Sequence, residues 1–327
     1  MVMAYDLTNT LVIGISSTAL FNMQESDNLF KEFCSSNPEK AIEQYRDYML
    51  LHENDELLPG TGFPLVEALL GLNKYKKEAD KSPLVEVVVM SRNSPDTGLM
   101  ILNNIRKKGV DITRSVFTGG ETVVDYLEAF NVDLFLTTSI DDAQRVIDSN
   151  ACAVAILKEP PKESIKYPQD QVRIAFDGDA VLFDESSEIV YKTKGINSFH
   201  AQENAKQNEP LAEGPYAMLL KKIARLQDRL PARVDYSPIR IALVTARNSP
   251  SELRVIKTLR AWGINVDEAF FLGGVEKTKI LKAFNPHIFF DDQDVHLEPA
   301  SVYVPSGRVP YASRSPLYQQ ILSIKPA

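Results

Sequence analysis

Two stretches decide the fold of this chain: "VEVVVMSRNSPDTGLMILNNIRKKGVDITRSVFTGG" at residues 85–120 and "IRIALVTARNSPSELRVIKTLRAWGINVDEAFFLGG" at residues 239–274. Each contains an apolar run, an identical RNSP, a segment of helical periodicity that stops at Gly109 or Gly263, and a second apolar run. A buried strand, an amphipathic helix and another strand are typical of a parallel sheet covered by helices. The chain therefore predicts an α/β fold that is built twice.

The similarity extends in both directions. "AFNVDLFLTTS" (129–139) is followed 154 positions later by "AFNPHIFFDDQ" (283–293), and "ISSTALF" (15–21) can be laid on "DGDAVLF" (177–183). We predict two tandem, doubly wound, Rossmann-like domains from an internal repeat, residues 1–165 (the first half) and 166–327 (the second half). The boundary is expected in the polar, proline-rich segment 158–171. In both halves the Ser-Pro of RNSP is expected to supply a helix N-cap and a first-turn proline.

Several polar residues occur only in the second half when RNSP and Leu-Phe set the alignment. Asp177, Asp179, Thr245, Lys277, Asp291 and Asp292 then stand opposite Ile15, Ser17, Met90, Val123, Thr137 and Thr138. All but Lys277 follow predicted strands, at the edge where open α/β sheets bind ligands. Carboxylates crowded there repel one another unless a divalent cation lies between them, and oxygen ligands suit Mg²⁺. Arg247 and Asn248 recur as Arg92 and Asn93, so we interpret both as structural.

These residues carry a resemblance. The order of Asp177, Asp179, Thr245, Lys277 and Asp291-Asp292 resembles the four motifs of the haloacid dehalogenase (HAD) superfamily of phosphotransferases. More closely, "AFDGDAVLFDESSE" (175–188), "LVTARNSP" (243–250) and "PHIFFDDQ" (286–293) resemble the cytosolic 5'-nucleotidase type I family. Members of that family hydrolyse nucleoside monophosphates with Mg²⁺.

The resemblance implies a mechanism. Asp177 would be the nucleophile and form an aspartyl-phosphate. Asp179 would protonate the leaving 5'-oxygen and then take a proton from water. Thr245 and Lys277 would bind the transferring phosphoryl group.

The resemblance also implies a metal site and a cap. The Mg²⁺ ligands would be Asp177, the backbone carbonyl of Asp179 and Asp291, with Asp292 either a further ligand or a support for the other ligands. The insertion at about residues 184–235 would be a helical cap that excludes water. Its candidate contacts with the nucleoside monophosphate are Phe199, His200, Glu203 and Asn208.

Composition excludes other classes of protein. A formal charge of −8 disfavours nucleic acid as a partner, and no apolar run approaches the roughly 20 residues of a membrane span. Two cysteines, Cys34 and Cys152, form no disulfide framework, which fits a cytoplasmic protein. The sequence leaves open a homo-oligomer, a HAD phosphatase for another small phosphomonoester, and a nucleotide-binding sensor without turnover.

Overall fold

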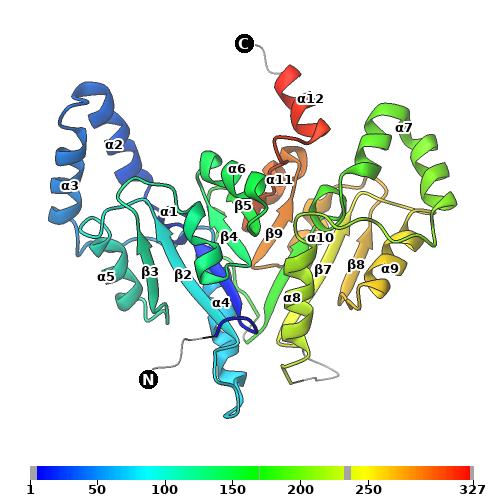
Figure 1. The fold of residues 1–327 in the computed structure, drawn as a ribbon, viewed down its shortest axis with the longest axis horizontal. Coiled ribbons are helices and arrows are strands. Elements are labelled where there is room, and N and C mark those ends of the chain that lie inside the picture. The colour runs from blue at the N-terminus through cyan, green and yellow to red at the C-terminus, as the bar shows by residue number, and fades with distance from the viewer. Residues whose placement is uncertain (1–5, 169, 232–236, 325–327) are drawn as a thin grey trace.

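One ten-stranded sheet runs through the molecule (Figure 1). The computed structural model describes residues 6–168, 170–231 and 237–324. In the first half the strands are β1 (Leu11–Ile15), β2 (Val85–Ser91), β3 (Arg114–Phe117), β4 (Leu134–Thr137) and β5 (Ala153–Leu157). In the second half they are β6 (Val172–Phe176), β7 (Ile239–Thr245), β8 (Glu268–Phe271), β9 (Ile288–Asp291) and β10 (Ser306–Arg308).

The two halves meet edge to edge within this sheet. Its spatial order is β3-β2-β1-β4-β5-β10-β9-β6-β7-β8. The strands pair in parallel except at the seam, where β10 is antiparallel to β5 and Gly307 lies opposite Leu157. The predicted α/β class and mostly parallel sheet are confirmed. The prediction did not include a sheet shared by both halves.

Helices cover both faces of the sheet. One face carries α4 (Phe63–Leu70), α5 (Leu99–Lys107), α8 (Ala217–Gln227) and α9 (Glu252–Ala261), over an apolar core that is continuous across the two halves. The other face carries α6 (Ile140–Ser149), α10 (Lys277–Phe284) and α11 (Asp294–Ser301), over two separate cores. The sheet is therefore buried on both sides, as a parallel sheet requires.

The remaining helices lie in the connections. Between β1 and β2 the chain forms α1 (Ser17–Leu20), α2 (Gln24–Ser36) and α3 (Ala41–Leu51); α7 (Ser186–Ala205) lies between β6 and β7, and α12 (Pro316–Ile324) follows β10. Figure 1 shows the α2–α3 pair and α7 at opposite ends of the molecule. Short helical turns span Gly71–Tyr75, Val124–Tyr126, Glu128–Phe130 and Gly178–Leu182. Residues 232–235 of the predicted insertion lie outside the described residues.

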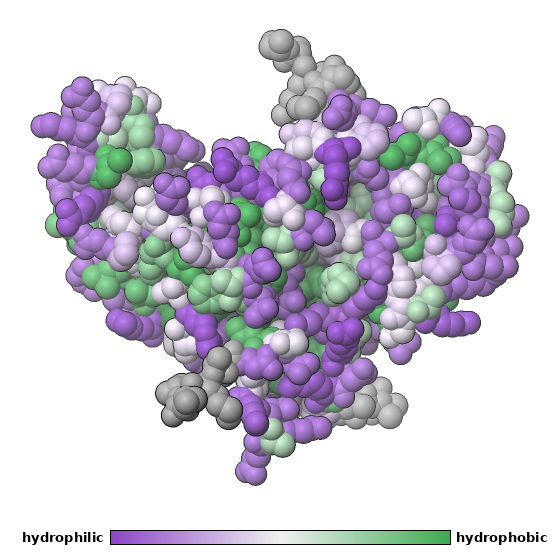
Figure 2. All heavy atoms as spheres, viewed as in Figure 1, coloured by the Kyte–Doolittle hydropathy of each residue, from purple (hydrophilic) through white to green (hydrophobic). Residues whose placement is uncertain are grey.

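The visible face of the molecule carries both polar and apolar side chains (Figure 2). Figure 2 shows hydrophilic and hydrophobic side chains interspersed over the visible face. Among the described helices, none is both long and apolar enough to cross a membrane.

The predicted helix starts are wrong and the predicted helix ends are right. α5 begins at Leu99 and α9 at Glu252, after Gly98 and Ser251 rather than at Ser-Pro. In the first half the backbone oxygen of Ser94 accepts a hydrogen bond from Gly98 N at 2.8 Å, so the tetrapeptide forms a turn before the helix. Gly109 and Gly263 follow the helix C-caps with φ of 64° and 70°, a conformation that favours glycine.

Backbone hydrogen bonds also correct the alignment at the end of β6. The amide of Asp177 donates to Phe290 O, and the amide of Ser16 donates to Leu136 O in the same way. The structural counterpart of Asp177 is therefore Ser16 rather than Ile15.

The same correction applies at the end of β7. Thr245 Oγ1 accepts a hydrogen bond from the amide of Arg247 at 3.2 Å, and Ser91 Oγ accepts one from the amide of Asn93 at 3.1 Å. The counterpart of Thr245 is thus Ser91 rather than Met90, and that of Arg247 is Asn93. RNSP begins one residue later relative to the end of the strand in the second half. Aligning the two RNSP segments therefore displaced the predicted counterpart of Thr245 by one residue.

Candidate active site

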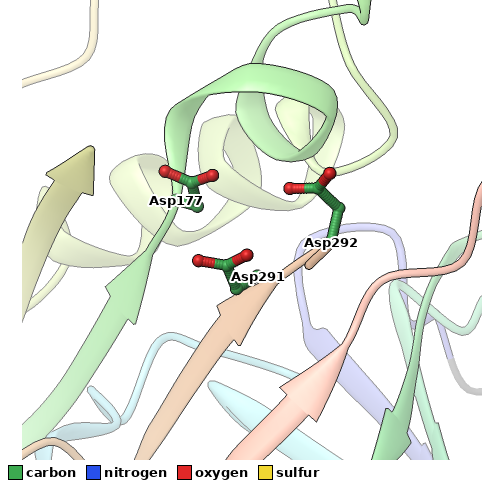
Figure 3. Close-up of side chains that lie close together, drawn as sticks. All are labelled: Asp177, Asp291 and Asp292. Atoms are coloured by element: carbon green, nitrogen blue, oxygen red, sulfur yellow. The ribbon is translucent and has the colours of Figure 1, made fainter. Parts of the chain in front are cut away.

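Three aspartates converge at one edge of the sheet (Figure 3). Asp177 is the first residue after β6, Asp291 ends β9, and Asp292 follows it. Because β6 and β9 are neighbouring parallel strands, their carboxyl ends meet. One carboxylate oxygen from each residue lies within 4.8 Å of the others, and all three residues are buried. The structure thus brings together three of the four predicted metal ligands.

Lys277, the first residue of α10, lies against this cluster. Its Nζ is 2.8 Å from Asp177 Oδ1 and 2.7 Å from Asp291 Oδ2, and its side chain is 2% exposed. Burial lowers the pKa of Lys277, but the two carboxylates raise it by more, so the ammonium group stays charged. One positive charge against three carboxylates leaves the cluster short of positive charge.

Burial and mutual repulsion raise the pKa values of the cluster. Burial raises the pKa of Asp177 to about 6, with Asp291 adding to the effect and Lys277 opposing it. The pKa of Asp292 is raised well above its ordinary value by burial and by the charges of Asp291 and Asp177. The metal-free cluster therefore favours proton uptake, and a divalent cation would supply the missing charge.

The donor set fits a hard cation. The buried Oδ1 atoms of Asp177 and Asp292 accept no hydrogen bond from the described residues, although the former is paired with Lys277. Asp292 Oδ2 accepts a hydrogen bond from Tyr311 Oη, and Asp291 Oδ1 accepts one from the amide of Gln293 at 2.8 Å. Oxygen atoms that are buried, close together and held in place by such bonds suit Mg²⁺.

Thr245 lies beside the turn that carries Asp177. It ends β7, is 1% exposed, and is separated from Gly178 by little space. A Cβ atom on Gly178 would lie 3.3 Å from Thr245 Oγ1. The glycine therefore lets the segment after β6 pass close to this hydroxyl group.

The carboxylate of Asp179 is bound by the guanidinium group of Arg247. Its Oδ2 and Oδ1 accept hydrogen bonds from Arg247 Nε at 2.8 Å and Nη2 at 2.6 Å. Nη1 of the same guanidinium is 2.6 Å from Glu203 Oε2 on α7. Asp179 is thus held by a residue that sequence analysis interpreted as structural.

The four candidate substrate contacts lie in different surroundings. Glu203 is fully buried, and the Phe199 ring centroid lies 5.3 Å from the guanidinium of Arg247. His200 Nε2 is 3.0 Å from Asn248 Oδ1. Asn208 is exposed and accepts a hydrogen bond from Lys257 Nζ on α9 at 2.6 Å. Phe199 and Glu203 therefore join the Arg247 contacts, whereas Asn208 contacts α9.

A cavity of about 1220 Å³ lies elsewhere among the described residues. It is lined by Thr18 and Thr138, beyond the carboxyl ends of β1 and β4, and by His287 and Pro305, before β9 and β10. Its lining contains both lysines and carboxylates, so the charge of the lining favours neither an anionic nor a cationic ligand. We place the candidate active site at the aspartate cluster because that cluster brings together buried carboxylates and the ammonium group of Lys277.

Comparison with known proteins agrees with this geometry. The family model described as 5'-nucleotidase matches residues 3–316. The chain belongs to the 5'-nucleotidase family. The predicted resemblance is thereby confirmed, and it covers nearly the whole chain.

A curated relative supports the same family. Cytosolic 5'-nucleotidase 1B from Homo sapiens is 36% identical over 297 residues, which make up 89% of this chain and 47% of that protein. The chain thus spans about half the length of the curated relative it matches. No solved structure matches the chain.

Three residues of the candidate site were not predicted from the sequence: Arg247, Arg254 and Tyr311. Arg247 was within reach, because it lies two residues after Thr245 at a strand end. Its identity with Arg92 misled the interpretation, since Arg92 is paired with Asp142 on α6 and has a different backbone position. Arg254 and Tyr311 carry no local signal, because their partners Glu203 and Asp292 are distant in sequence.

Proposed function

We propose that this chain is a Mg²⁺-dependent 5'-nucleotidase that hydrolyses nucleoside 5'-monophosphates to nucleoside and phosphate. The observation that carries the proposal is the buried cluster of Asp177, Asp291 and Asp292 around Lys277. The family match and the name of the relative support the substrate class.

Asp177 performs the first step. One of its carboxylate oxygens forms a bond to phosphorus while the bond from phosphorus to O5' breaks, which gives an aspartyl-phosphate. Asp179 gives a proton to the departing O5', so the nucleoside leaves as a neutral alcohol. Lys277 and Thr245 donate hydrogen bonds to the phosphoryl oxygens, where negative charge must be balanced.

Asp179 acts again in the second step. A water oxygen attacks phosphorus, Asp179 takes the proton of that water, and the bond from phosphorus to Asp177 breaks. Inorganic phosphate is released and both aspartates return to their starting forms.

Mg²⁺ would be held by Asp177, Asp291, Asp292 and the backbone carbonyl of Asp179. When bound it supplies positive charge that offsets the carboxylates and the phosphate.

We further propose an internal repeat, with a first half that keeps the fold and lacks the site. At the positions equivalent to Asp177 and Thr245 the first half has Ser16 and Ser91, so it lacks the carboxylate of Asp177. We place the division between the halves at residues 165 and 166. The insertion at residues 184–235, with α7, is proposed as a cap in the HAD-like second half. Its proposed nucleotide contacts are Phe199, His200, Glu203 and Asn208. A cytoplasmic location and self-association remain proposals.

A substrate panel tests the function. We would measure phosphate release from the 5'-monophosphates of adenosine, guanosine, inosine, cytidine and uridine, and from simple sugar phosphates, with Mg²⁺ or with a chelator. We expect metal-dependent release from nucleotides and a loss of at least ~10³-fold in Asp177→Asn. Asp125→Asn, which alters an exposed carboxylate of the first half, is the control.

Two results would contradict the proposal. Faster turnover of sugar phosphates would mean that the substrate class is wrong. Nucleotide binding without release at saturating Mg²⁺ would instead indicate a sensor.

A further inference from the structure

Arg247 is the centre of a buried ion-pair network that joins separate elements of the second half. It follows β7 and binds both oxygens of Asp179, which lies in the turn after β6. Its remaining terminal nitrogen binds Glu203 on α7. The side chains of Arg247, Asp179 and Glu203 are 2%, 13% and 0% exposed. A guanidinium group has donors in a fixed plane, so this contact sets the orientation of the carboxyl group of Asp179.

Glu203 is itself held from two further sides. Its Oε1 lies 2.9 Å from Arg254 Nη1 and accepts a hydrogen bond from Ser187 Oγ at 2.9 Å. The ring of Phe199 lies under the Arg247 guanidinium. Two arginines balance two carboxylates, so the network is neutral as a whole. Arg247 is therefore held by a residue of α7 on one side and holds Asp179 on the other.

The first half shows what the same backbone position does without an acid–base carboxyl group. There Asn93 takes the place of Arg247, and Gly119 N and Gly273 N donate to the backbone oxygens of Asn93 and Arg247 in the same way. Asn93 Oδ1 accepts hydrogen bonds from Ser91 Oγ at 2.7 Å and from Ser17 Oγ at 3.5 Å. The turn thus forms without a guanidinium group. The arginine is present in the half that has Asp179.

We infer that Arg247 is the positioning residue of Asp179 and couples the proton transfers of Asp179 to the placement of α7. The inference rests on the acid–base role of Asp179 in the proposed function. Both oxygens of Asp179 are bound to Arg247, so each oxygen has its second lone pair left for the exchange of a proton with O5' or water. The pair with Glu203 holds the guanidinium in place during this exchange.

Leaving-group dependence tests the inference. Departure of a nucleoside needs a proton from Asp179, whereas p-nitrophenolate leaves from p-nitrophenyl phosphate without one. kcat/KM reports the steps up to cleavage of the phosphorus–oxygen bond, so it isolates this difference. We would compare kcat/KM for p-nitrophenyl phosphate with that for the best of the five nucleotides, in Arg247→Lys, Glu203→Gln and Asp179→Asn. Arg92→Lys is the matched control, because Arg92 is the arginine of the other RNSP.

We expect Arg247→Lys to lower kcat/KM for the nucleotide at least about tenfold more than for p-nitrophenyl phosphate, as part of the 10²- to 10⁴-fold that a general acid contributes. Lysine keeps the charge and loses the two parallel donors. The extra loss of kcat/KM for the nucleotide should be smaller in Glu203→Gln and larger in Asp179→Asn. Arg92→Lys should change neither value.

Equal losses for both substrates in Arg247→Lys, or a loss confined to thermal stability, would overturn the inference and assign Arg247 a structural role. An inactive wild type or an active Asp177→Asn would overturn the proposed function, and the inference with it. A selective loss in Asp179→Asn without one in Arg247→Lys would leave the proposed function intact and overturn the inference alone.

Discussion

Lys277 lies where two carboxylates of neighbouring strands would otherwise face each other unpaired. Its ammonium group contacts Asp177 and Asp291 at 2.8 and 2.7 Å in a buried position. Removing one partner of a buried ion pair costs more than the pair contributes, because the remaining charge has no water around it. Lys277 therefore affects folding as well as the proposed phosphoryl transfer.

Lys277→Met is expected to lower kcat/KM at least ~10²-fold and to destabilise the metal-free protein by about 3–5 kcal/mol at pH 7.5. The loss of stability should shrink at pH 5. The folded-state pKa of Asp177 is about 6 even beside Lys277, above its ordinary value, so the cost of its charge is present above pH 6 and is relieved as the pH falls. Urea unfolding with chelator at both pH values measures this.

Lys279→Met is the control for that experiment, because Lys279 lies on the same helix and is exposed. A Lys277→Met variant equally destabilised at pH 5 and pH 7.5 would show that repulsion between carboxylates is not the cause.

At the level of single residues, the sequence was informative about chemistry and silent about partners. Asp177, Asp291 and Lys277 were predicted because the second half has a charged residue at each of these positions and the first half does not, and the structure places the three together. The contact of Asp179 with Arg247 was not predicted. Nothing in a local pattern says that a side chain on the loop after β7 will reach the turn after β6 rather than point to solvent.

Among the elements, α7 determines where the candidate cap residues lie. Its backbone is interrupted at Gly195, where φ is 77° and ψ is 175°. This conformation is almost restricted to glycine. Phe199, His200 and Glu203 all follow the interruption, so their placement depends on it.

Gly195→Ala is expected to destabilise the protein by about 1–3 kcal/mol, because alanine must adopt that backbone conformation or shift the second part of α7. Gly71→Ala is the matched control. Gly71 has φ of −58° and open space at its Cβ position, so alanine there should be neutral or stabilising. Urea midpoints of the two variants and the wild type measure the effect. An unchanged midpoint in Gly195→Ala would mean that α7 tolerates a continuous helix.

The contact between β6 and β9 gives a prediction about pH. His287 precedes β9, its Nδ1 accepts a hydrogen bond from the amide of Arg173 at 3.0 Å, and its ring stacks on Tyr167. Burial, together with the charge of Arg173, lowers the pKa of His287 to about 4. The folded state therefore holds a neutral imidazole.

Because this folded-state pKa lies below the ordinary value near 6.5, the stability is complete above pH 6.5 and is lost as the pH falls towards 4. Linkage predicts that His287 alone costs the folded state about 2 kcal/mol at pH 5. We would measure urea unfolding of the wild type and of His287→Asn at pH 7.5 and 5.0. The wild type should lose more stability than the variant between these values, and an equal loss would contradict the prediction.

Strands and helix ends were predictable at this scale, and helix starts were not. Apolar runs mark buried strands, and glycine marks the residue after a helix because few other residues adopt its positive φ. Ser-Pro fits an N-cap and equally a turn, and in both halves it lies in a turn that precedes the helix. The sequence of this segment is compatible with both structures, the N-cap and the turn.

Across the whole molecule, the two halves are joined more closely than two domains linked by a hinge. The seam between β5 and β10 continues the sheet, and one apolar core extends under both halves. Ion pairs cross the junction, between Lys158 and Asp294 at 2.6 Å and between Arg229 and Asp80 at 3.4 Å. This union could not be predicted, because the edge of β10 that meets β5 leaves no periodic pattern in three residues.

The segment after β10 also connects the first half to the candidate active site. The amide of Ser313 donates to Asp148 on α6 at 2.6 Å. Two residues earlier, Tyr311 donates to Asp292 of the cluster. A short piece of chain thus ties α6, a helix of the first half, to a proposed Mg²⁺ ligand of the second half. The first half therefore helps to place the site that it lacks.

We expect the two halves to unfold together. Trp262, the one tryptophan of the sequence, packs against Phe183, so its fluorescence reports the second half, whereas far-UV circular dichroism reports both. Because the core and the sheet are shared, both signals should follow the same urea transition. A circular-dichroism change that precedes the fluorescence change would show that the first half unfolds alone.

Gly307→Val sharpens that test at the seam. A Cβ atom on Gly307 would lie 3.0 Å from the Cβ of Ala155 and 3.1 Å from Cδ2 of Leu157, so a larger side chain must displace these neighbours at the seam. If the seam joins the halves into one cooperative unit, this substitution lowers both midpoints by the same amount, since neither half keeps its stability without the other. If it instead separates the two signals, the remaining contacts of the shared core are too weak to couple the halves, and cooperativity depends on the three residues of β10.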